Sequence, residues 1–509
     1  MSADRIPATR PLDHLAMIGL DSDAALVLRE GVLSYQDLRA RVAALSGWLR
    51  DGAGLEPGAR VATWAAKGAL TCLMPLAAAR AGLVHVPINP LLKRAQAAHI
   101  LADSGAALLV ANAARMAGLD AEDVPDGCRI IDEVTLWAAV GQSSSSLGPS
   151  ASDPAELAAI LYTSGSTGAP KGVMLSHANL WLGAVSVAQY LGLSAADRIL
   201  AVLPLAFDYG QNQLLSTWHA GGCVIPLDYL TPRDVIKAVA RHDVTTLAAV
   251  PPLWVQLTEL EWPEDARASL TRLTNSGGAL TRDLVTRLRA LFPAARIFAM
   301  YGLTEAFRST YLDPALIDAQ PTSMGSAIPF AEVLVVADEG GEAAVDEEGE
   351  LVHCGPLVTQ GYWRDAARTA ERFRPAPAFS RLGGTAVWSG DRVRRDAQGL
   401  LHFAGRRDAM IKSAGNRISP QEIEDAALAT GLVAEAVALG VPDARLGQAI
   451  HLVVRARGTA SEAALDLPGK LLQELPNFMQ PKVIHWRETM PLGATGKLDR
   501  AALALELAA

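Results

Sequence analysis

Cysteine is scarce in this chain of 509 residues, which has four, at positions 72, 128, 223 and 354. None forms a C-x-x-C pair, and this spacing argues against both a zinc site and a disulfide framework. Isolated thiols are typical of a reducing compartment. The first residues also lack the apolar run of a signal peptide. We therefore expect a cytoplasmic protein.

A basic excess is missing as well. Lys and Arg number 45 against 54 Asp and Glu, which gives a formal net charge of −9. No basic stripe offsets this balance, so a nucleic-acid-binding surface is not indicated. The most apolar long window, Ala69 to Ile88, is interrupted by Arg80 and has the pattern of a core helix and strand, not of a membrane span. We expect neither a nucleic-acid partner nor a membrane partner.

The remaining composition is that of a globular protein, with 50% apolar and 19% charged residues. A chain of this length is too long for one core, so we expect two or more domains. Helical and strand patterns alternate in its first third, which favours parallel βαβ units covered by helices. The expected helices are residues 34–50, 70–81 and 92–102, and the expected strands are residues 60–64, 84–88, 107–110 and 157–161.

The pattern changes after Arg407. An amphipathic helix is expected over residues 420–429, and strands over residues 436–439 and 450–454. We therefore predict a mixed α/β protein with a large N-terminal domain, residues 1–407, and a small mobile C-terminal α+β domain, residues 408–509. The Ser-rich run at 143–146 and the stretch 375–384 are predicted to be loops.

The most informative segment is residues 161–180, LYTSGSTGAPKGVMLSHANL, which follows an apolar strand pattern. Its glycines permit close backbone approach, its hydroxyls and amides can surround an anion, and Lys171 can bind phosphate. The kinase-type phosphate loop is excluded, because Gly165 and Gly168 are three apart and Lys171 precedes Gly172. A plain surface linker is disfavoured by the Pro-Lys-Gly turn and the flanking apolar runs. The segment predicts a loop for the phosphates of a nucleotide.

This loop resembles the signature Y-T-S-G-[ST]-T-G-x-P-K-G of the AMP-forming adenylating enzymes, which include acyl-CoA synthetases, nonribosomal adenylation domains and luciferases. Four more elements follow in the order of that family. They are Y-G-L-T-E at 301–305, S-G-D at 389–391, G-R-R-D at 405–408 continuing to residue 418, and P-L-G-A-T-G-K-L-D-R at 491–500. The resemblance therefore spans residues 161–500, and the N-terminal third fits it by length and pattern.

The resemblance implies that a carboxylate attacks the α-phosphorus of ATP, giving an acyl adenylate and pyrophosphate. Two anions meet in this step, so the site must neutralise charge. By matching motifs, Lys497 would bridge the carboxylate and the α-phosphate, Thr304 would contact the α-phosphate, and Glu305 would hold Mg²⁺. The other residues implied to bind ATP are Thr163, Ser164, Gly165, Ser166, Thr167, Gly168, Lys171, Gly277, Gly278, Ala279, Tyr301, Gly302, Asp391, Arg406 and Arg417.

A thiol would attack the adenylate in a second step. The resemblance implies rotation of the C-terminal domain about Asp408, which moves Lys497 away and brings Lys412 and Gly415 to the site. The thiol belongs to the phosphopantetheine arm of CoA or of a carrier protein, and the sequence leaves the two open. The chain ends soon after the lysine motif, so we expect a free-standing enzyme that acts on a separate thiol.

The acid pocket departs from the common fatty-acid pattern. Phe207 and Asp208 resemble the Phe-Asp pair of amino-acid adenylation domains, in which the aspartate binds the ammonium of the substrate. The same mapping adds Tyr209, Asn212, Ser276, Met300, Arg308 and Ser309 to the pocket. A buried guanidinium is costly unless it is paired.

Two interpretations of Arg308 remain open. It pairs with Asp208 or another protein carboxylate, and the pocket takes an ordinary acid. Alternatively it binds a second carboxylate of the substrate, while Asp208 and Ser276 bind the amine. The second interpretation predicts an amino acid resembling aspartate, glutamate or a methylated analogue, with a β-amino acid included in this class, loaded onto a carrier protein. The alternative function is that of an acyl-CoA synthetase for a fatty or aryl acid.

Two other classes are less favoured. Nothing in the sequence marks an oxygen reaction of the luciferase kind. A catalytically inactive binding module would be expected to lose Lys497 or Glu305, and both are present.

Overall fold

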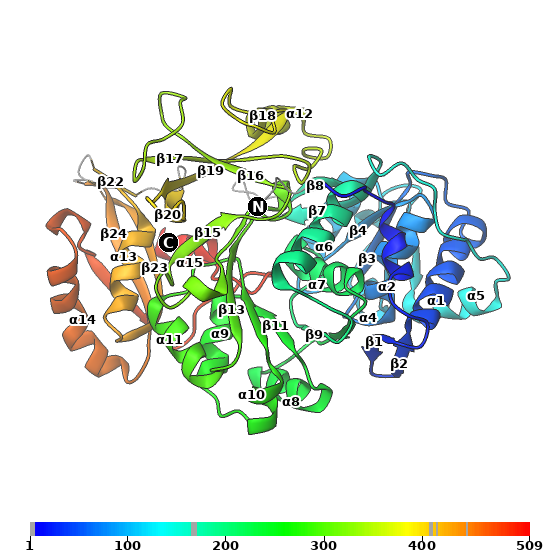
Figure 1. The fold of residues 1–509 in the computed structure, drawn as a ribbon, viewed down its shortest axis with the longest axis horizontal. Helices are drawn as coiled ribbons and strands as arrows, with labels where there is room; N and C mark the ends of the chain where they lie inside the picture. Colours follow the sequence, from blue (N-terminus) through cyan, green and yellow to red (C-terminus); the bar gives the residue numbers. More distant parts are fainter. Residues whose placement is uncertain (1–5, 164–169, 407–410, 414–415, 444–445, 509) are drawn as a thin grey trace.

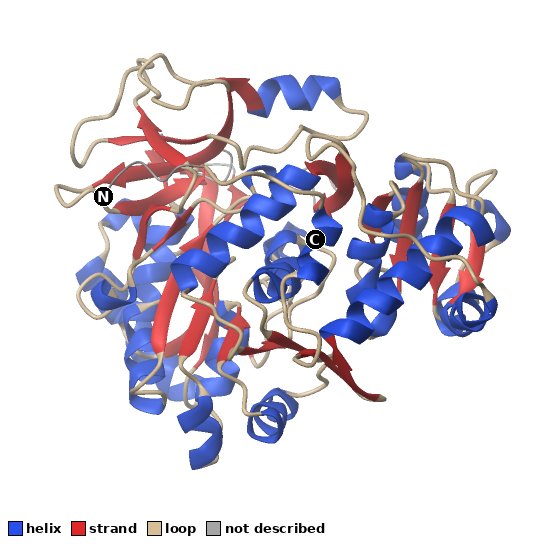
Figure 2. Cartoon of the chain, turned by 45° about the vertical axis from the view of Figure 1, so that its right-hand side comes forward, coloured by secondary structure: helices blue, strands red, loops and turns tan. Residues whose placement is uncertain are grey.

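The computed structural model describes residues 6–163, 170–406, 411–413, 416–443 and 446–508 (Figure 1). Within these residues the chain forms a large N-terminal part built on two sheets and a small C-terminal part built on a third. Figure 2 shows helices on both sides of the strands. The mixed α/β architecture expected from the sequence is confirmed. No helix of the described residues is both long and apolar enough to cross a membrane.

The first sheet has the order β6-β5-β3-β4-β7-β8. Its strands are β3 (Arg60–Trp64), β4 (Val84–Pro87), β5 (Leu108–Ala111), β6 (Arg129–Asp132), β7 (Leu157–Thr163) and β8 (Lys171–Ser176). All neighbours are parallel except β7 and β8, which form an antiparallel hairpin. The helices of this part are α1 (Tyr35–Gly47), α2 (Ala69–Arg80), α3 (Arg94–Ser104), α4 (Ala113–Met116) and α5 (Glu133–Gln142). The predicted alternation of strands and helices is therefore confirmed.

Helix α1 begins at a reciprocal cap between Ser34 and Asp37. Ser34 accepts a hydrogen bond from the amide of Asp37, whose carboxylate accepts in turn from the amide of Ser34. Such a reciprocal cap satisfies two free amides at a helix start. The α-helix ends before the predicted residue 50, because the chain widens into a π-helical turn, Trp48–Gly52.

The second sheet runs in the order β16-β17-β19-β20-β15-β14-β13-β12-β11-β9-β10-β1-β2, and β18 pairs with β19. Its strands are β1 (Ala24–Leu28), β2 (Gly31–Ser34), β9 (Arg198–Ala201), β10 (Cys223–Pro226), β11 (Thr246–Ala249), β12 (Arg272–Asn275), β13 (Arg296–Tyr301), β14 (Thr310–Tyr311), β15 (Ser323–Ala327), β16 (Glu332–Val336), β17 (Glu348–Cys354), β18 (Phe373–Pro375), β19 (Thr385–Arg395) and β20 (Leu401–Arg406). Strands β10, β9, β11, β12 and β13 are parallel, so their carboxyl ends share one edge of the sheet.

The helices of the second sheet complete the N-terminal part. They are α6 (His177–Leu191), α7 (Asp208–His219), α8 (Pro232–His242), α9 (Pro251–Thr258), α10 (Glu264–Ser269), α11 (Arg282–Leu291) and α12 (Ala366–Arg372). Helices α6 and α7 pack on each other, and their apolar side chains share one core with strands of both sheets. The two sheets are therefore joined through this helix pair, and the site is built where their strands end.

The C-terminal part has the strand order β22-β21-β24-β23, and β25 pairs with β24. Its elements are β21 (Ile411–Ser413), β22 (Asn416–Ile418), α13 (Pro420–Ala429), β23 (Val433–Asp443), β24 (Gly447–Ala456), α14 (Ala460–Glu474), β25 (Val483–Arg487) and α15 (Arg500–Ala508). It has a core of its own and lies beside the large sheet in Figure 1 (orange to red). The helix predicted over residues 420–429 is confirmed, and the two predicted strands lie within β23 and β24.

Two ion pairs join the C-terminal part to the N-terminal part. Arg455 of β24 lies 3.2 Å from Glu259, and Arg457 lies 2.8 Å from Asp283. The expected domain boundary at Asp408 lies outside the described residues.

Candidate active site

The β7–β8 hairpin carries the predicted phosphate loop between its strands. Thr163 is the register partner of Lys171 at the base of the loop. Lys171 Nζ lies 3.4 Å from Glu305 Oε1, so the predicted phosphate-binding lysine and the predicted metal-binding carboxylate meet. Burial raises the pKa of Glu305, but the Lys171 ammonium and the Tyr362 hydroxyl outweigh it and hold that pKa below its ordinary value. Ser164, Gly165, Ser166, Thr167 and Gly168 lie outside the described residues.

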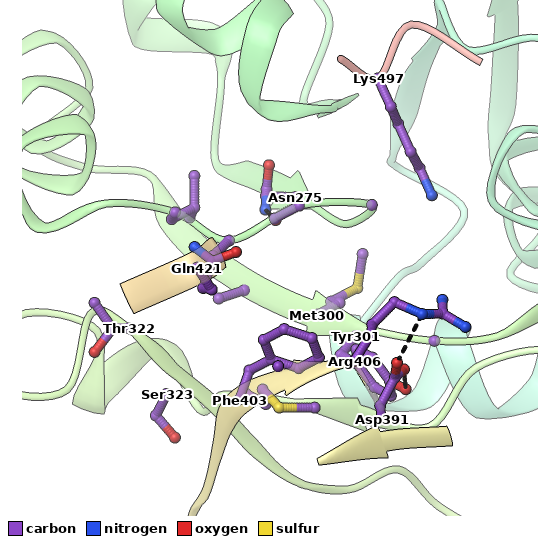
Figure 3. Close-up of a pocket in the computed structure, with 18 of the residues that line it drawn as sticks. Asn275, Met300, Tyr301, Thr322, Ser323, Asp391, Phe403, Arg406, Gln421 and Lys497 are labelled. Atoms are coloured by element: carbon purple, nitrogen blue, oxygen red, sulfur yellow. Dashed lines mark hydrogen bonds and ion pairs between the residues drawn. The ribbon is translucent and has the colours of Figure 1, made fainter. Parts of the chain in front are cut away.

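A cavity of about 370 Å³ opens beside the carboxyl ends of β12 and β13 (Figure 3). It brings together nine residues predicted from the sequence, namely Gly277, Gly278, Ala279, Met300, Tyr301, Gly302, Asp391, Arg406 and Lys497. Sequence reasoning missed Asn275, Phe403 and Gln421, which also line this cavity. These three are single residues in ordinary helix, strand or loop patterns, so no local signal marks them.

Asp391 is fixed at one end of the cavity. Its side chain is 3% exposed and accepts a hydrogen bond from the Tyr301 hydroxyl. Arg406 Nε lies 3.5 Å from Asp391 Oδ1. Burial and the neighbouring carboxylate both raise the pKa of Tyr301 well above its ordinary value, so the phenol stays a hydrogen-bond donor. The arrangement leaves a fixed carboxylate suited to accept hydrogen bonds from a ligand's hydroxyl groups.

Lys497 enters the cavity from the C-terminal part (Figure 3). Asn89 supports its loop by donating a 2.6 Å hydrogen bond to the carbonyl of Ala494. Gly277 has φ +81°, and a Cβ at this position would overlap the Lys497 side chain. Burial lowers the pKa of Lys497, Asp208 opposes this effect, and Arg308 adds to it. The ammonium thus lies within electrostatic range of both predicted acid-binding residues.

Asp208 is the first residue of α7 and is buried. The turn before α7 brings the carbonyl of Pro204 so close to Gly210 that a Cβ at Gly210 would overlap it. The Thr304 hydroxyl donates a 3.1 Å hydrogen bond to Asp208 Oδ1. Thr304, predicted to contact the α-phosphate of ATP, and Asp208, predicted to bind the acid, are therefore neighbours.

Arg308 lies in the turn between β13 and β14. The preceding residue, Phe307, has φ +58°, a conformation that is rare for a bulky side chain. The Phe307 ring packs against Gly183 of α6, where a Cβ would overlap it. This packing holds the turn so that the Arg308 side chain is only 1% exposed. The strain is therefore located next to a predicted specificity residue.

The surroundings of Arg308 give no support to an internal ion pair, which is one of its two open interpretations. Among the described residues, no carboxylate oxygen lies within 4.0 Å of its guanidinium. Its Nε has no hydrogen-bond partner there either. The guanidinium instead lies 4.5 Å from the centre of the Tyr209 ring. Asp208 is turned toward Thr304 and is not the partner of Arg308.

A second, inner cavity of about 20 Å³ lies beside Arg308. Asn212 and Met300 line it too, and Met300 also lines the larger cavity. Both amide atoms of Asn212 and the Thr246 hydroxyl are buried without a hydrogen-bond partner in the described part of the chain. Buried polar groups normally have partners. This inner cavity is therefore lined mostly by apolar surface but contains several hydrogen-bonding groups that have no partner among the described residues.

The structure does not bring every predicted residue to a cavity. Four predicted acid-binding residues are buried but line neither cavity, namely Phe207, Asp208, Ser276 and Ser309. Four residues predicted for the phosphates and magnesium also line neither cavity, namely Thr163, Lys171, Thr304 and Glu305. The Ser309 hydroxyl lies 3.0 Å from Nδ1 of His353 and is thereby engaged. Lys412 and Arg417 are register partners in β21 and β22, although their side chains are not described. Asp408 and Gly415 lie outside the described residues.

Comparison with known proteins decides the family. The model of the AMP-binding enzyme family matches residues 6–363, and that of the AMP-binding enzyme C-terminal domain matches residues 422–497. The chain belongs to the AMP-binding enzyme family. As the resemblance implied, the chain is an AMP-forming ligase that joins a carboxylate to a thiol.

Relatives of known activity cover almost the whole chain. An L-proline–[L-prolyl-carrier protein] ligase of Pseudomonas fluorescens is 30% identical over 95% of this chain and 96% of its own. A feruloyl-CoA synthase of Amycolatopsis is 30% identical over 94% and 95%. A sulfoacetate–CoA ligase of Cupriavidus necator is 33% identical over 89% and 88%.

Solved structures of the family share the fold. The ATP-bound MatB of Rhodopseudomonas palustris superposes with a TM-score of 0.87 at 25% identity, covering 98% of this chain and 99% of the other. This adenylating ligase therefore has the family's arrangement of a large N-terminal and a small C-terminal domain.

Proposed function

We propose that this ligase adenylates an amino acid with a second carboxylate, of the aspartate, glutamate or methylated kind. It then transfers the acyl group to the phosphopantetheine thiol of a carrier protein. In the first step the substrate carboxylate attacks the α-phosphorus of ATP and pyrophosphate leaves. In the second, the thiol attacks the acyl carbon and AMP leaves. The choice of acid is carried by one observation, the buried Arg308, for which the described part of the chain provides no carboxylate partner.

Removing a guanidinium from water costs several kcal/mol unless an anion compensates it. Tyr209 offers a cation–π contact, which is worth about 0.5–2 kcal/mol and is not enough. The inner cavity beside Arg308 adds the unpartnered amide of Asn212. A carboxylate that enters this compartment would accept hydrogen bonds from both groups. These contacts support a second anionic group on the acid.

An amine on the acid is supported by Asp208. This carboxylate is buried next to Lys497, and its only hydrogen bond among the described side chains comes from Thr304. A substrate ammonium would therefore meet a fixed negative charge at Asp208 and a fixed positive charge at Arg308. An amino dicarboxylate has an ammonium for Asp208 and a second carboxylate for Arg308, whereas an acid without these two groups has a partner for neither residue.

The relatives support parts of this proposal. The prolyl-carrier protein ligase is named for an amino acid and a carrier protein. The sulfoacetate–CoA ligase is named for an acid that bears a second anionic group. The feruloyl-CoA synthase favours the alternative, an acyl-CoA synthetase for a fatty or aryl acid. That alternative leaves the buried charge of Arg308 without a partner.

The motif matches, together with the proposed reaction, give the other residues their roles. Lys497 would neutralise the substrate carboxylate and the α-phosphate as they approach. Asp391 would accept from the ribose hydroxyls, and Gly277 to Ala279 would lie along the adenine. The boundary near Asp408 would be the hinge between domains 1–407 and 408–509, so that Lys497 leaves and Lys412 approaches before thiol attack.

Glu305 fits a magnesium ion that arrives with ATP. The described residues contain no group of three or more His, Cys, Asp or Glu that could hold a metal by themselves. Mg²⁺ is commonly held by one or two carboxylates together with substrate phosphates, and Glu305 beside Lys171 offers such a carboxylate. When bound, the ion would supply charge neutralisation of the polyphosphate.

The test is ATP–pyrophosphate exchange across a panel of acids. The panel contains fatty acids, aryl acids, neutral α- and β-amino acids, and aspartate and glutamate analogues with and without a β-methyl group. We expect selective exchange with an amino dicarboxylate, followed by loading onto a phosphopantetheinylated carrier protein. Selective exchange with a fatty or aryl acid, and transfer to CoA, would establish the alternative.

A further inference from the structure

Tyr362 was not singled out by its sequence, yet it lies against the phosphate lysine. The segment 360–363 runs beside β8, with hydrogen bonds from Met174 N to Gly361 O at 2.9 Å and from Trp363 N to Gly172 O at 2.8 Å. Tyr362 is the bridge partner of Val173. Lys171 and Val173 share one face of β8, because side chains alternate along a strand. Tyr362 is thereby a diagonal neighbour of Lys171.

Three side chains close a triangle at this point. The Tyr362 hydroxyl donates to Glu305 Oε1 at 2.6 Å and accepts from Lys171 Nζ at 2.8 Å. The direct Lys171–Glu305 distance, 3.4 Å, is the longest side. The Tyr362 hydroxyl therefore lies closer to each of the two charged groups than these groups lie to each other.

The Tyr362 ring itself has little freedom. The residue is 2% exposed, and its ring packs edge-on against Phe373 at 5.5 Å. Its amide donates to the Thr369 hydroxyl at 2.9 Å. A phenol fixed on both sides can hold a mobile lysine and a carboxylate in place, because its own position does not depend on either of them.

The surroundings add positive charge. Burial lowers the pKa of Lys171, and Arg372 and Arg368 of α12 lower it further. Arg372 donates to the carbonyl of Trp388 at 3.1 Å. Lys171 is thus flanked by two more cations, of which Arg368 also pairs with Asp365 at 3.4 Å. This positive surrounding suits a polyphosphate, and the Lys171 ammonium helps to keep Glu305 ionised.

The direct contact between Lys171 and Glu305 has to change when ATP is bound. The polyphosphate competes for the ammonium, and magnesium competes for the carboxylate. We propose that Tyr362 is a positioning residue, whose hydroxyl remains the shared partner of Glu305 and Lys171 and presents both to magnesium–ATP. This inference rests on the roles given to Lys171 and Glu305 under the proposed function.

The test compares Tyr362→Phe with the wild type by calorimetric titration of the full chain. The probe is α,β-methylene-ATP, whose α–β linkage cannot be cleaved, with and without Mg²⁺. Hydrogen bonds to charged groups are the strong ones. We expect the affinity gained on adding Mg²⁺ to fall by about ten-fold or more in the variant. Tyr229→Phe, a half-buried tyrosine away from this cluster, is the matched control and should keep the full gain.

Glu305→Gln provides the reference for loss of the magnesium effect. Adding Tyr362→Phe to it should change the magnesium gain little, because two members of one network are not additive. A Tyr362→Phe variant with the wild-type magnesium gain would overturn the inference. Equal weakening with and without Mg²⁺, together with a lower Tm, would also overturn it, because the phenol would then be structural. A wild type without any magnesium gain would instead refute the role of Glu305 itself.

Discussion

Replacing Arg308 by methionine removes a buried charge and keeps a side chain of similar length. If this charge binds the second carboxylate of the substrate, the variant leaves that carboxylate buried and unpaired. Loss of one partner of a buried ion pair costs about 3–5 kcal/mol. This corresponds to a loss of about 10²–10⁴-fold in kcat/KM for the dicarboxylate. An analogue that lacks the second carboxylate should lose less than about ten-fold.

The same substitution makes an unusual prediction about stability. In the free protein no carboxylate lies within 4.0 Å of Arg308 in the described part of the chain, and its Nε has no hydrogen-bond partner there. Burial of such a charge opposes folding. We therefore expect the Tm of Arg308→Met to equal or exceed that of the wild type. A specificity residue that costs stability is typical of a functional site.

Arg272 offers a matched control, because it is also a buried arginine. Its guanidinium pairs with Asp197 and donates to the carbonyl of Leu191 at 2.8 Å. Arg272→Met should therefore lower the stability by about 3–5 kcal/mol and affect both acids equally.

The assay is pyrophosphate exchange with both acids on the wild type and both variants, with Tm measured on the same samples. The coupling between Arg308 and the second carboxylate is the difference between the two losses. Equal losses with the two acids, accompanied by a lower Tm, would refute the reasoning and make Arg308 a structural residue.

Four further predictions concern other parts of the molecule. Lys497→Ala should abolish adenylate formation and spare thiol transfer from a supplied adenylate, so equal loss in the two half-reactions would contradict the domain rotation. Asp408→Pro should uncouple the half-reactions, and unchanged overall turnover would argue against a hinge there. Burial lowers the pKa of His353 to about 4, whereas its pKa in the unfolded chain is about 6.5. As the pH falls, the unfolded chain therefore binds this proton first. The free energy of unfolding should fall by up to about 3 kcal/mol between pH 6.5 and pH 4. Urea unfolding at pH 7 and pH 4.5 should show a smaller drop for His353→Gln than for the wild type. Gly183→Ala should lower stability by about 1–3 kcal/mol by overpacking against the buried Phe307 ring, whereas full stability in a thermal melt would mean that the ring can move.

Much of the nucleotide side of the site could be predicted from the sequence, because its residues lie in local motifs. Tyr301, Asp391 and Lys497 belong to three separate motifs, and the structure brings them to one cavity. Tyr301 ends β13, Asp391 follows Gly390 inside β19, and Lys497 follows Gly496 in a loop; both glycines have a positive φ, so a short stretch of residue types determines the backbone at these two positions. Matching motifs gave Lys171 and Glu305 separate roles, at the phosphates and at Mg²⁺, and the structure places the two side chains 3.4 Å apart although 134 positions separate them.

The acid side and the supports of the site were harder to predict. Tyr362 contacts partners that are 57 and 191 positions away, and nothing in its own segment indicates them. Whether Arg308 pairs with Asp208 depends on the turn set by Phe307 and on the glycine opposite its ring. Sequence spacing does not encode the direction in which a buried side chain points. The sequence therefore leaves both interpretations of Arg308 open.

The charges around Lys497 connect recognition of the acid with the chemistry. Besides burial, Arg308 and Arg406 lower the pKa of Lys497, whereas Asp208 raises it. Arg406 also pairs with Asp391, so Arg308 is the cation near Lys497 for which the described residues provide no carboxylate within 4.0 Å. Like charges held together in a buried site are unfavourable until anions arrive. Under the proposed function, the α-phosphate and the reacting carboxylate would offset Lys497, and a second carboxylate would offset Arg308. An acid without that group would leave the Arg308 charge uncompensated next to the reacting atoms, so Arg308 would both select the substrate and complete the charge balance of its adenylation.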